Sequence, residues 1–325
     1  MMRSWLDSFL ADRYQYVIYG SSRSQLFYVT SGVCQGSALG PLLFIIYMLD
    51  LPACISGPVA QYADDTTLYR QISSTEDAKI LQEDLNHVSL WCQLNNMALN
   101  PTKSTYLRVT RSTHPIDTSY SICNLQVPSV KAVKILGVTV TSDLKWNNHT
   151  AVIRNKAAKT LGFISRCFKG AKCSVISLLY KSLVRSSLLF AAPAWHPTTG
   201  ANLAALERVQ NRATRLILGC KKSDTRSSDA RRAACGLPSL GELWDKITLS
   251  FFCKCLTGAC DLLVFHPDRV TVKPRRVGLR GDRCVLTTPR STCSAYLASF
   301  FPRAVSLFQT LPEEVRLKHV PAPSQ

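Results

Sequence analysis

The chain has 325 residues, of which 46% are hydrophobic, so it is long and apolar enough for two domains with buried cores; a disordered or fibrous protein is excluded. Its 39 Lys and Arg exceed its 21 Asp and Glu, and the excess lies in one half. Residues 1–150 carry 11 basic and 11 acidic side chains, whereas residues 151–325 carry 28 and 10. The electrostatic field of this positive excess favours a polyanionic partner for the second half. A basic surface that only keeps the protein in solution is the alternative.

No segment is typical of a secretory signal or a membrane span. Asp7 and Asp12 interrupt any apolar run at the start. The apolar stretch from Ala38 to Leu49 is shorter than the roughly 18 residues that a spanning helix needs. We therefore expect no membrane partner.

The 13 cysteines are scattered and odd in number, which argues against a disulfide framework and indicates a reducing, intracellular compartment. Nothing in the sequence separates nucleus from cytoplasm. Cys253, Cys255, Cys260 and His266 lie near one another, but their spacing matches no usual zinc framework. Buried thiols on a core element are the favoured interpretation, and no zinc is expected.

In the first half, hydrophobic spacing predicts an α+β arrangement. A tight hairpin is expected where two short apolar strands flank an acidic turn. Helices covering one side of an antiparallel sheet would produce this order of elements. In chain order we expect a helix end at 5–10, a strand at 14–19, an apolar, buried helix at 37–49, strands at 59–62 and 66–69, a helix at 76–97 capped at Ser74 or Thr75, a strand at 106–109, a loop with a short strand at 112–130, and a β segment at 133–140.

The second half is predicted to be helical. Helices are expected at 150–168, 174–190 and 202–218, the last ended by Gly219. A basic linker at 221–235, a helix near 240–260, a Pro- and Arg-rich stretch at 267–290 and a helical tail at 296–314 follow.

Basic side chains repeat at helical spacing on three consecutive predicted helices. A solvated cationic face is the default interpretation of any single pair, but the repetition favours a surface that follows a phosphate backbone. The candidate residues are Lys181, Arg185, Arg208, Arg212 and Arg215, with Arg154, Lys156 and Lys159 on the preceding helix.

Asp64 and Asp65 are expected at the tip of the predicted hairpin. Two adjacent carboxylates repel each other unless a cation is present, so the pair is a natural half of a divalent-metal site. Two such metal ions stabilise the attacking and leaving oxygens in nucleotidyl transfer. Asp is also common in ordinary turns, so the dipeptide by itself favours a plain turn.

The motifs around the dipeptide favour the metal-site interpretation over a plain turn. Residues 61–66, Gln-Tyr-Ala-Asp-Asp-Thr, resemble the Y-x-D-D box of reverse transcriptases. Residues 32–44 resemble the segment that precedes this box in non-LTR, LINE-type and jockey-like retrotransposons. Residues 91–104 are similar to their lysine-bearing motif, and residues 134–149 to their primer-grip segment. The order and spacing of these motifs identify the chain as similar to that family.

The resemblance implies a role for each matching position. Asp64 and Asp65 would bind Mg²⁺ or Mn²⁺ in a two-metal site, and Lys103 would lie near the triphosphate as a possible proton donor. Gln35, Gly36 and Tyr62 would contact the nucleotide or template, and Leu136 and Gly137 would hold the primer end. The implied partners are an RNA template, a DNA primer and deoxynucleoside triphosphates. Considered without the motifs, the favoured interpretation of Lys103 is a solvated loop lysine, and that of Gly137 is a turn or bulge glycine.

The chain departs from the family pattern in two ways. Cys34 stands where the family usually has Pro, and the first palm motif, with a third metal-binding aspartate, has no counterpart near the start. Asp7 and Asp12 lie in the wrong context to replace it, and the fingers and an endonuclease are also absent from these 325 residues. We therefore expect little or no polymerase activity from them.

The fold class expected is α+β: a partial polymerase palm, an antiparallel sheet with helices, followed by a helical basic thumb and a C-terminal extension. The expected boundaries are 1–141 for the palm, 142–220 for the thumb-like region and 221–325 for the extension. The expected function is RNA-directed DNA synthesis, impaired in this chain. A non-catalytic nucleic-acid-binding remnant of such an element is the alternative, and a structural protein without nucleic acid is a more distant one.

Overall fold

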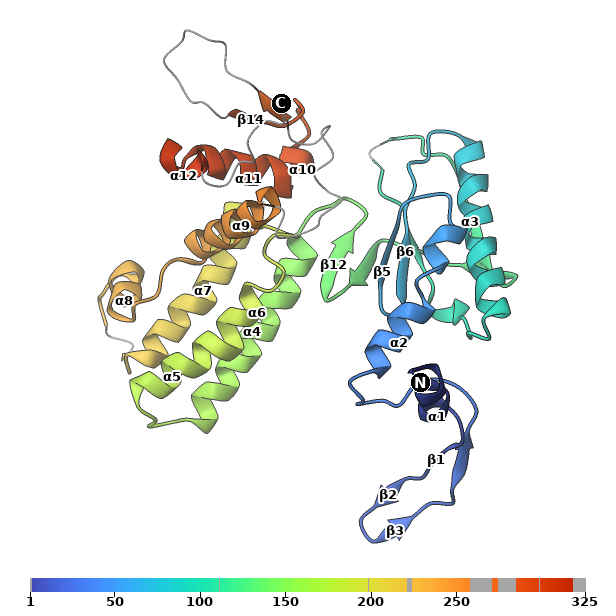
Figure 1. Cartoon of the computed structure of the whole chain (residues 1–325). Coiled ribbons are helices and arrows are strands. Elements are labelled where there is room, and N and C mark those ends of the chain that lie inside the picture. The colour runs from blue at the N-terminus through green and yellow to red at the C-terminus, as the bar shows by residue number, and fades with distance from the viewer. Residues whose placement is uncertain are drawn as a thin grey trace. The chain divides into compact units, whose positions relative to one another are not determined.

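The computed structural model describes residues 2–110, 112–197, 199–220, 224–257, 271–273, 285–297 and 299–317. They form two compact units, each described by itself below (Figure 1). The first comprises Met1–Tyr106 and Ser112–Pro128, and the second comprises Leu107–Arg111 and Ser129–Gln325. No helix in the described ranges is both long enough and apolar enough to cross a membrane.

The first unit combines short antiparallel hairpins with α-helices. Its elements are α1 (Met2–Leu10), β1 (Arg13–Gln15), β2 (Ile18–Tyr19), β3 (Ser22–Arg23), β4 (Phe27–Val29), α2 (Gly40–Tyr47), the 3-10 helix η1 (Leu51–Cys54), β5 (Val59–Tyr62), β6 (Asp65–Leu68), α3 (Thr75–Leu94), the 3-10 helix η2 (Pro101–Lys103), β8 (Tyr120–Ile122) and β9 (Leu125–Val127). The chain passes between the units at β7 (Tyr106–Leu107) and β10 (Ser129–Val130).

The α+β class is confirmed, but the strands pair only two by two. In the first unit β1 pairs with β4, β2 with β3, β5 with β6 and β8 with β9. Each ladder is short, and the described residues contain no sheet of more than two strands. The predicted domain boundaries remain a prediction.

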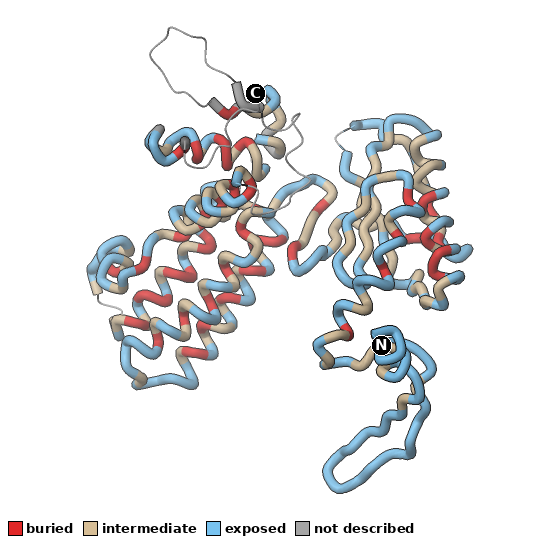
Figure 2. Tube along the Cα trace, viewed as in Figure 1, coloured by how far each residue is buried: buried red, intermediate tan, exposed pale blue. Residues whose placement is uncertain are grey.

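Helix α3 covers one face of the β5–β6 hairpin. It begins with a capping box, in which the Ser74 hydroxyl accepts the Asp77 N–H and the Asp77 carboxylate accepts the Ser74 N–H. As the spacing predicts, Val88 and Cys92 are buried on its inner face, which is visible in Figure 2. They form a small core with residues of η1 and the partly buried Val59 and Leu68 of the hairpin.

Two expectations in this unit are wrong. The helix predicted at 37–49 forms as α2, but Leu42, Ile45 and Ile46 on it are more than half exposed. Phe44 and the following Met48 join the core under α3, and Tyr47 packs edge-to-face on Trp91 there. No described residue buries the opposite face of α2. The loop expected at 112–130 contains two paired strands, β8 and β9.

The second unit is mainly helical. Its elements are β11 (Ala132–Ile135), β12 (Val138–Thr141), α4 (Asn147–Cys167), α5 (Cys173–Leu179), the π-helical turn η3 (Tyr180–Arg185), α6 (Ser186–Leu188), α7 (Gly200–Ile217), α8 (Ser228–Ala234), α9 (Leu240–Leu256), β13 (Thr271–Lys273), β14 (Val285–Thr287), α10 (Ser294–Leu297), α11 (Phe300–Gln309) and α12 (Glu313–Leu317).

The main core of this unit lies between α4, the α5–η3–α6 segment, α7 and the start of α9. Apolar stripes on α4 and α7 face this core, and Trp195 and Trp244 are fully buried in it. A second core joins α9 to β14 and α11 around Phe252 and Phe308. Gly219 follows α7 in the left-handed conformation (φ +61°), as predicted for a helix end.

The β segment predicted at 133–140 is confirmed and forms a hairpin, β11–β12, that turns at Leu136 and Gly137. Two local expectations need correction here. The helix expected at 174–190 is interrupted by η3. The linker expected at 221–235 contains α8, whose Arg231 is buried with a hydrogen bond from its guanidinium to the Arg226 carbonyl.

The predicted cluster of cysteines divides between described and undescribed residues. Cys253 and Cys255 lie on α9, where Cys255 is buried and Cys253 packs on the second core, so the core interpretation is confirmed for these two. Cys260 and His266 lie outside the described residues. The cysteines within the described ranges are free thiols.

Candidate functional site: an acidic hairpin turn and a basic helical surface

The acidic pair lies at the tip of the β5–β6 hairpin, as predicted. The register pairs Tyr62 with Asp65, so Ala63 and Asp64 form a two-residue loop and Asp65 is the first residue of β6. Ala63 adopts a left-handed conformation (φ +53°), which costs free energy in a residue with a Cβ. Both carboxylates are exposed. The turn therefore presents two adjacent acidic groups to solvent on a framework that α3 holds from one side.

The described residues supply only part of a metal site at this turn. Adjacent exposed carboxylates suit a hard divalent cation, because such ions prefer oxygen ligands. However, no group of three His, Cys, Asp or Glu side chains gathers anywhere in the described ranges. A pair of metal ions needs more protein ligands than two. The acidic turn thus fits half of a two-metal site and not the whole of it.

Gln35 and Gly36 lie in an exposed loop just before α2. The hydroxyl of Ser37 donates to the Cys34 carbonyl and accepts the Gly40 N–H, at 2.7 and 2.9 Å, which fixes the start of the helix. Gly36 has φ +84° with open space around its Cα, so a side chain there would be opposed by backbone conformation rather than by a clash. A partner could approach this backbone closely.

Lys103 is exposed at the end of η2, and no hydrogen bond or ion pair in the described chain joins it to Asp64 or Asp65. Tyr62 is 66% exposed on the strand that leads into the acidic turn. The structure thus places Tyr62, Asp64 and Asp65 on one hairpin, and among the described residues no bond joins Lys103 to the two carboxylates.

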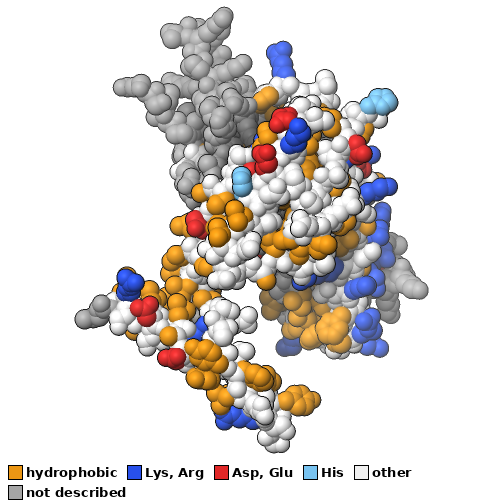
Figure 3. Space-filling model, turned by 90° about the vertical axis from the view of Figure 1, so that its right-hand side faces the viewer, with side chains coloured by type: hydrophobic (Ala, Val, Ile, Leu, Met, Phe, Trp, Pro, Cys, Tyr) orange, Lys and Arg blue, Asp and Glu red, His pale blue; other side chains and the backbone are white. Residues whose placement is uncertain are grey.

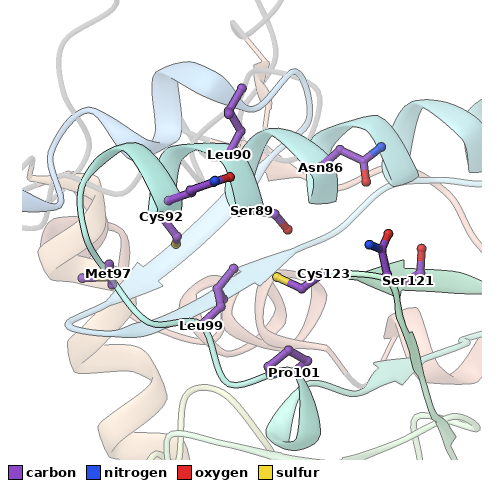
Figure 4. Close-up of a pocket in the computed structure, with 11 residues that line it drawn as sticks. Asn86, Ser89, Leu90, Cys92, Met97, Leu99, Pro101, Ser121 and Cys123 are labelled. Carbon is purple, nitrogen blue, oxygen red and sulfur yellow. The ribbon is translucent and has the colours of Figure 1, made fainter.

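A cavity of about 640 Å³ in the first unit does not coincide with the acidic turn. Figure 4 shows it between α3 and the turn after β8, lined by Asn86, Ser89, Cys92, Leu99 and Cys123, among others. Burial and the nearby Cys123 raise the pKa of Cys92, so that thiol is neutral and unreactive near pH 7. The lining contains no carboxylate and no cation. We therefore assign the cavity no part in phosphate or metal chemistry.

Leu136 and Gly137, the predicted primer-grip residues, form the turn of the β11–β12 hairpin in the second unit. Both have positive φ, +46° and +89°. Leu136 is half exposed. A Cβ added to Gly137 would lie 3.2 Å from the Phe190 ring, a tight contact, so glycine is favoured here mainly by the positive φ.

A basic hollow of about 430 Å³ lies between α4 and α7. Lys159 and Arg166 line it from α4, and Arg212 lines it from α7. None of these three cations forms an ion pair with a described residue. Figure 3 shows Lys and Arg side chains gathered in a column with few acidic groups among them. The hollow is therefore suited to an anionic group.

The remaining predicted cations divide into two groups. Arg208 and Arg215 are exposed on α7 beside Arg212, so the predicted arginine row is present. Lys181 and Arg185 are half-buried on η3 and do not line the hollow. Arg166 was not singled out in the sequence, although its i, i+7 spacing from Lys159 would have placed both on one face of the helix.

The acidic turn lies within a match to a known protein family. Residues 1–140 match the family described as "Reverse transcriptase (RNA-dependent DNA polymerase)". These residues are similar to the reverse transcriptase family. They include the acidic turn, Lys103 and the β11–β12 hairpin, and the resemblance to jockey-like non-LTR elements is confirmed by the relatives.

Several relatives are proteins of Drosophila transposable elements. The chain is 29% identical over 226 residues to the probable RNA-directed DNA polymerase from transposon X-element of Drosophila melanogaster, covering 66% of this chain and 25% of that protein. It is 26% identical over 228 residues to the RNA-directed DNA polymerase from mobile element jockey of the same species, covering 65% and 24%. The jockey polymerase of Drosophila funebris is 24% identical over 313 residues, covering 92% of this chain and 32% of that protein. The match spans about a quarter to a third of the relatives' length.

Proposed function

We propose that the chain is the part of an RNA-directed DNA polymerase that carries the acidic turn of the palm and a basic, thumb-like helical region. The reaction would be the addition of deoxynucleotides to a primer 3′ end on an RNA template. The observation that carries this proposal is the exposed Asp64–Asp65 turn within residues that match the reverse transcriptase family. We also propose a reducing compartment, because the described cysteines are free thiols.

The acidic turn would contribute carboxylate oxygens to Mg²⁺ or Mn²⁺, which neutralise negative charge at the transferred phosphate. Because the described residues place only two carboxylates there, we infer weak metal binding and impaired polymerase activity for this chain alone. Lys103 and the Gln35–Gly36 loop would contact the bound nucleotide. The proposed work of the protein groups is positioning and charge stabilisation, not covalent catalysis.

The basic hollow would hold a phosphate of the nucleic-acid backbone. Lys159, Arg166 and Arg212 converge on it from two helices, and Arg208 and Arg215 extend the surface along α7. Cations that neutralise phosphates release counterions, so binding should weaken as salt rises. Removing one such cation should lower the slope of log affinity against log salt by about one per contact.

Primer extension tests the proposed polymerase. The purified chain is incubated with an RNA template, a DNA primer, deoxynucleotides and Mg²⁺, alongside Asp64→Asn and, as a matched control, Asp7→Asn on α1. We expect little or no extension by any of the three. Extension that needs Mg²⁺ and Asp64 would overturn the inferred impairment while supporting the polymerase function. Extension that survives Asp64→Asn would contradict the role of the acidic turn.

A second candidate function is a non-catalytic nucleic-acid-binding remnant, favoured by an acidic turn with only two carboxylates in the first unit and a basic surface in the second. Binding of a labelled RNA·DNA duplex, measured by fluorescence anisotropy at several salt concentrations, distinguishes it. Arg208/Arg212/Arg215→Ala should abolish binding, and Asp64→Ala should leave binding unchanged. Absence of binding at low salt would contradict both candidates and favour a protein that does not contact nucleic acid.

A further inference from the structure

His149 is completely buried in the first turn of α4, where a polar ring is costly unless it is hydrogen-bonded. Its Nδ1 accepts the N–H of Thr139 at 3.2 Å. Thr139 lies on β12, which pairs on one side only, so part of its backbone has no partner in the ladder. His149 thus satisfies an edge N–H of the β11–β12 hairpin and attaches that hairpin to the helical bundle.

A second set of contacts runs from the same histidine to the tip of the hairpin. The His149 ring packs edge-to-face on Trp195, with ring centroids 4.5 Å apart. The Trp195 indole N–H donates to the Phe190 carbonyl at 2.9 Å. The Phe190 ring in turn lies against Gly137. His149 therefore contacts the hairpin directly at Thr139 and, through Trp195 and Phe190, supports its turn.

This arrangement fixes a strained turn at two points. Leu136 and Gly137 both have positive φ, which costs free energy in Leu136 because it has a Cβ and costs little in Gly137. All the residues involved belong to the second compact unit. Leu136 remains half exposed at the end of this support and is free to contact a ligand.

We propose that His149 is a positioning residue that holds the Leu136–Gly137 turn in place for the primer end. The contact of the turn with a primer rests on the proposed function, whereas the attachment of the hairpin to α4 does not. A neutral imidazole is needed, because Nδ1 must be unprotonated to accept the Thr139 N–H while Nε2 carries the proton. His149 acts through the hairpin and does not itself contact the nucleic acid.

Two substitutions separate the hydrogen bond from the packing. In His149→Asn the side-chain oxygen can take the position of Nδ1 and accept the Thr139 N–H. In His149→Phe the aromatic ring against Trp195 is retained and the acceptor is lost. His87→Phe is the matched control, because His87 is exposed on α3 in the other unit.

Hydrogen–deuterium exchange of residues 132–141 is the first measurement. We expect exchange at Thr139 to be roughly tenfold faster in His149→Phe, as for the loss of one hydrogen bond, and near wild type in His149→Asn and His87→Phe. Equal protection in His149→Phe and the wild type would overturn the attachment. If His149→Phe does not fold, Phe190→Ala serves instead: it should speed exchange at Val138, which pairs with Ile135 across the turn, and unchanged exchange there would overturn the support of the turn.

The second measurement is the affinity of the chain for a recessed primer on an RNA template, followed by fluorescence anisotropy. His149→Phe should weaken binding several-fold, and His149→Asn should restore it. A loosened hairpin with unchanged affinity would overturn the positioning role alone. If the wild-type chain does not bind the duplex, the proposed function and the primer contact of the turn are both overturned, and the exchange experiment still judges the attachment of the hairpin.

Discussion

The two compact units bury their apolar residues to very different extents. In the helical unit, stripes on α4, α7 and α9 face one another around a continuous core that includes Trp195 and Trp244. In the first unit, the cores around α3 are small, and α1 buries no residue at all. Apolar side chains on α2 are exposed to solvent there. The helical unit therefore has the packing of an independently stable body, whereas the first unit depends on a few contacts around α3.

The largest expected effect is in the helical core. Trp195→Ala should lower the free energy of unfolding by about 3–5 kcal/mol, because it leaves a large cavity and removes the contact with His149. Phe163→Ala, at a half-exposed position on α4, should change it by less than about 1 kcal/mol. Urea denaturation followed by circular dichroism measures both. Similar losses in the free energy of unfolding of the two variants would contradict the burial of Trp195 in the helical core.

In the first unit, the most sensitive position should be a buried carboxylate. Asp84 on α3 accepts the Ser56 N–H at 2.7 Å and pairs with Arg70 at 3.1 Å. Burial raises the pKa of Asp84, but the bonds from Ser56 and Arg70 outweigh it and the pKa is lowered overall. Asp84→Asn should destabilise this unit by about 3 kcal/mol, because Arg70 loses its partner. Glu83 is exposed at the preceding position, so Glu83→Gln should leave the free energy of unfolding unchanged. Equal losses in the two variants would contradict this role of Asp84.

Acid should weaken the helical unit through two histidines. Burial lowers the pKa of His149, and burial with the nearby Arg303 lowers that of His196 to about 4. Both are therefore neutral when folded, while an unfolded chain takes up protons near pH 6.5. Their stability contribution is full above about pH 6.5 and is lost as the pH falls towards 4. Urea titrations from pH 7.5 to 4.5 should show this decline, and stability that stayed constant or rose would contradict it.

The smallest effect is expected on α2. Ile45→Ser should change the free energy of unfolding by less than about 0.5 kcal/mol, because Ile45 is already 57% exposed. Ile176→Ser on α5 is the matched substitution at a buried position and should cost several times more. A large loss in Ile45→Ser would show that α2 is covered and would remove the contrast between the two units.

Local signals in the sequence predicted much of the structure. The helix cap at Ser74 and the acidic hairpin depend on neighbours within a few residues, and both form as predicted. The burial of α2 was mispredicted, because apolar spacing does not reveal whether a second surface packs against a helix. Only the motifs around the acidic turn predicted it as a candidate metal site, since Asp is common in any turn.

Features that depend on long-range packing were not predictable from the sequence. Arg231 is buried in a stretch whose composition is typical of a linker. Arg166 joins the basic hollow because α4 packs beside α7. The contact of His149 with Thr139 joins two elements whose register no local pattern determines. Each required knowledge of which faces meet in three dimensions.

Metal binding at the acidic turn tests the central claim most directly. Mn²⁺ is titrated into the wild-type chain, Asp64→Asn, Asp65→Asn and the control Asp7→Asn, and free Mn²⁺ is measured by electron paramagnetic resonance. We predict weak binding by the wild type and by Asp7→Asn that is lost in both turn variants, with no change in the free energy of unfolding because both carboxylates are exposed. Mn²⁺ binding that is the same in all four proteins would contradict the assignment of this turn as the metal-binding turn of a reverse transcriptase palm.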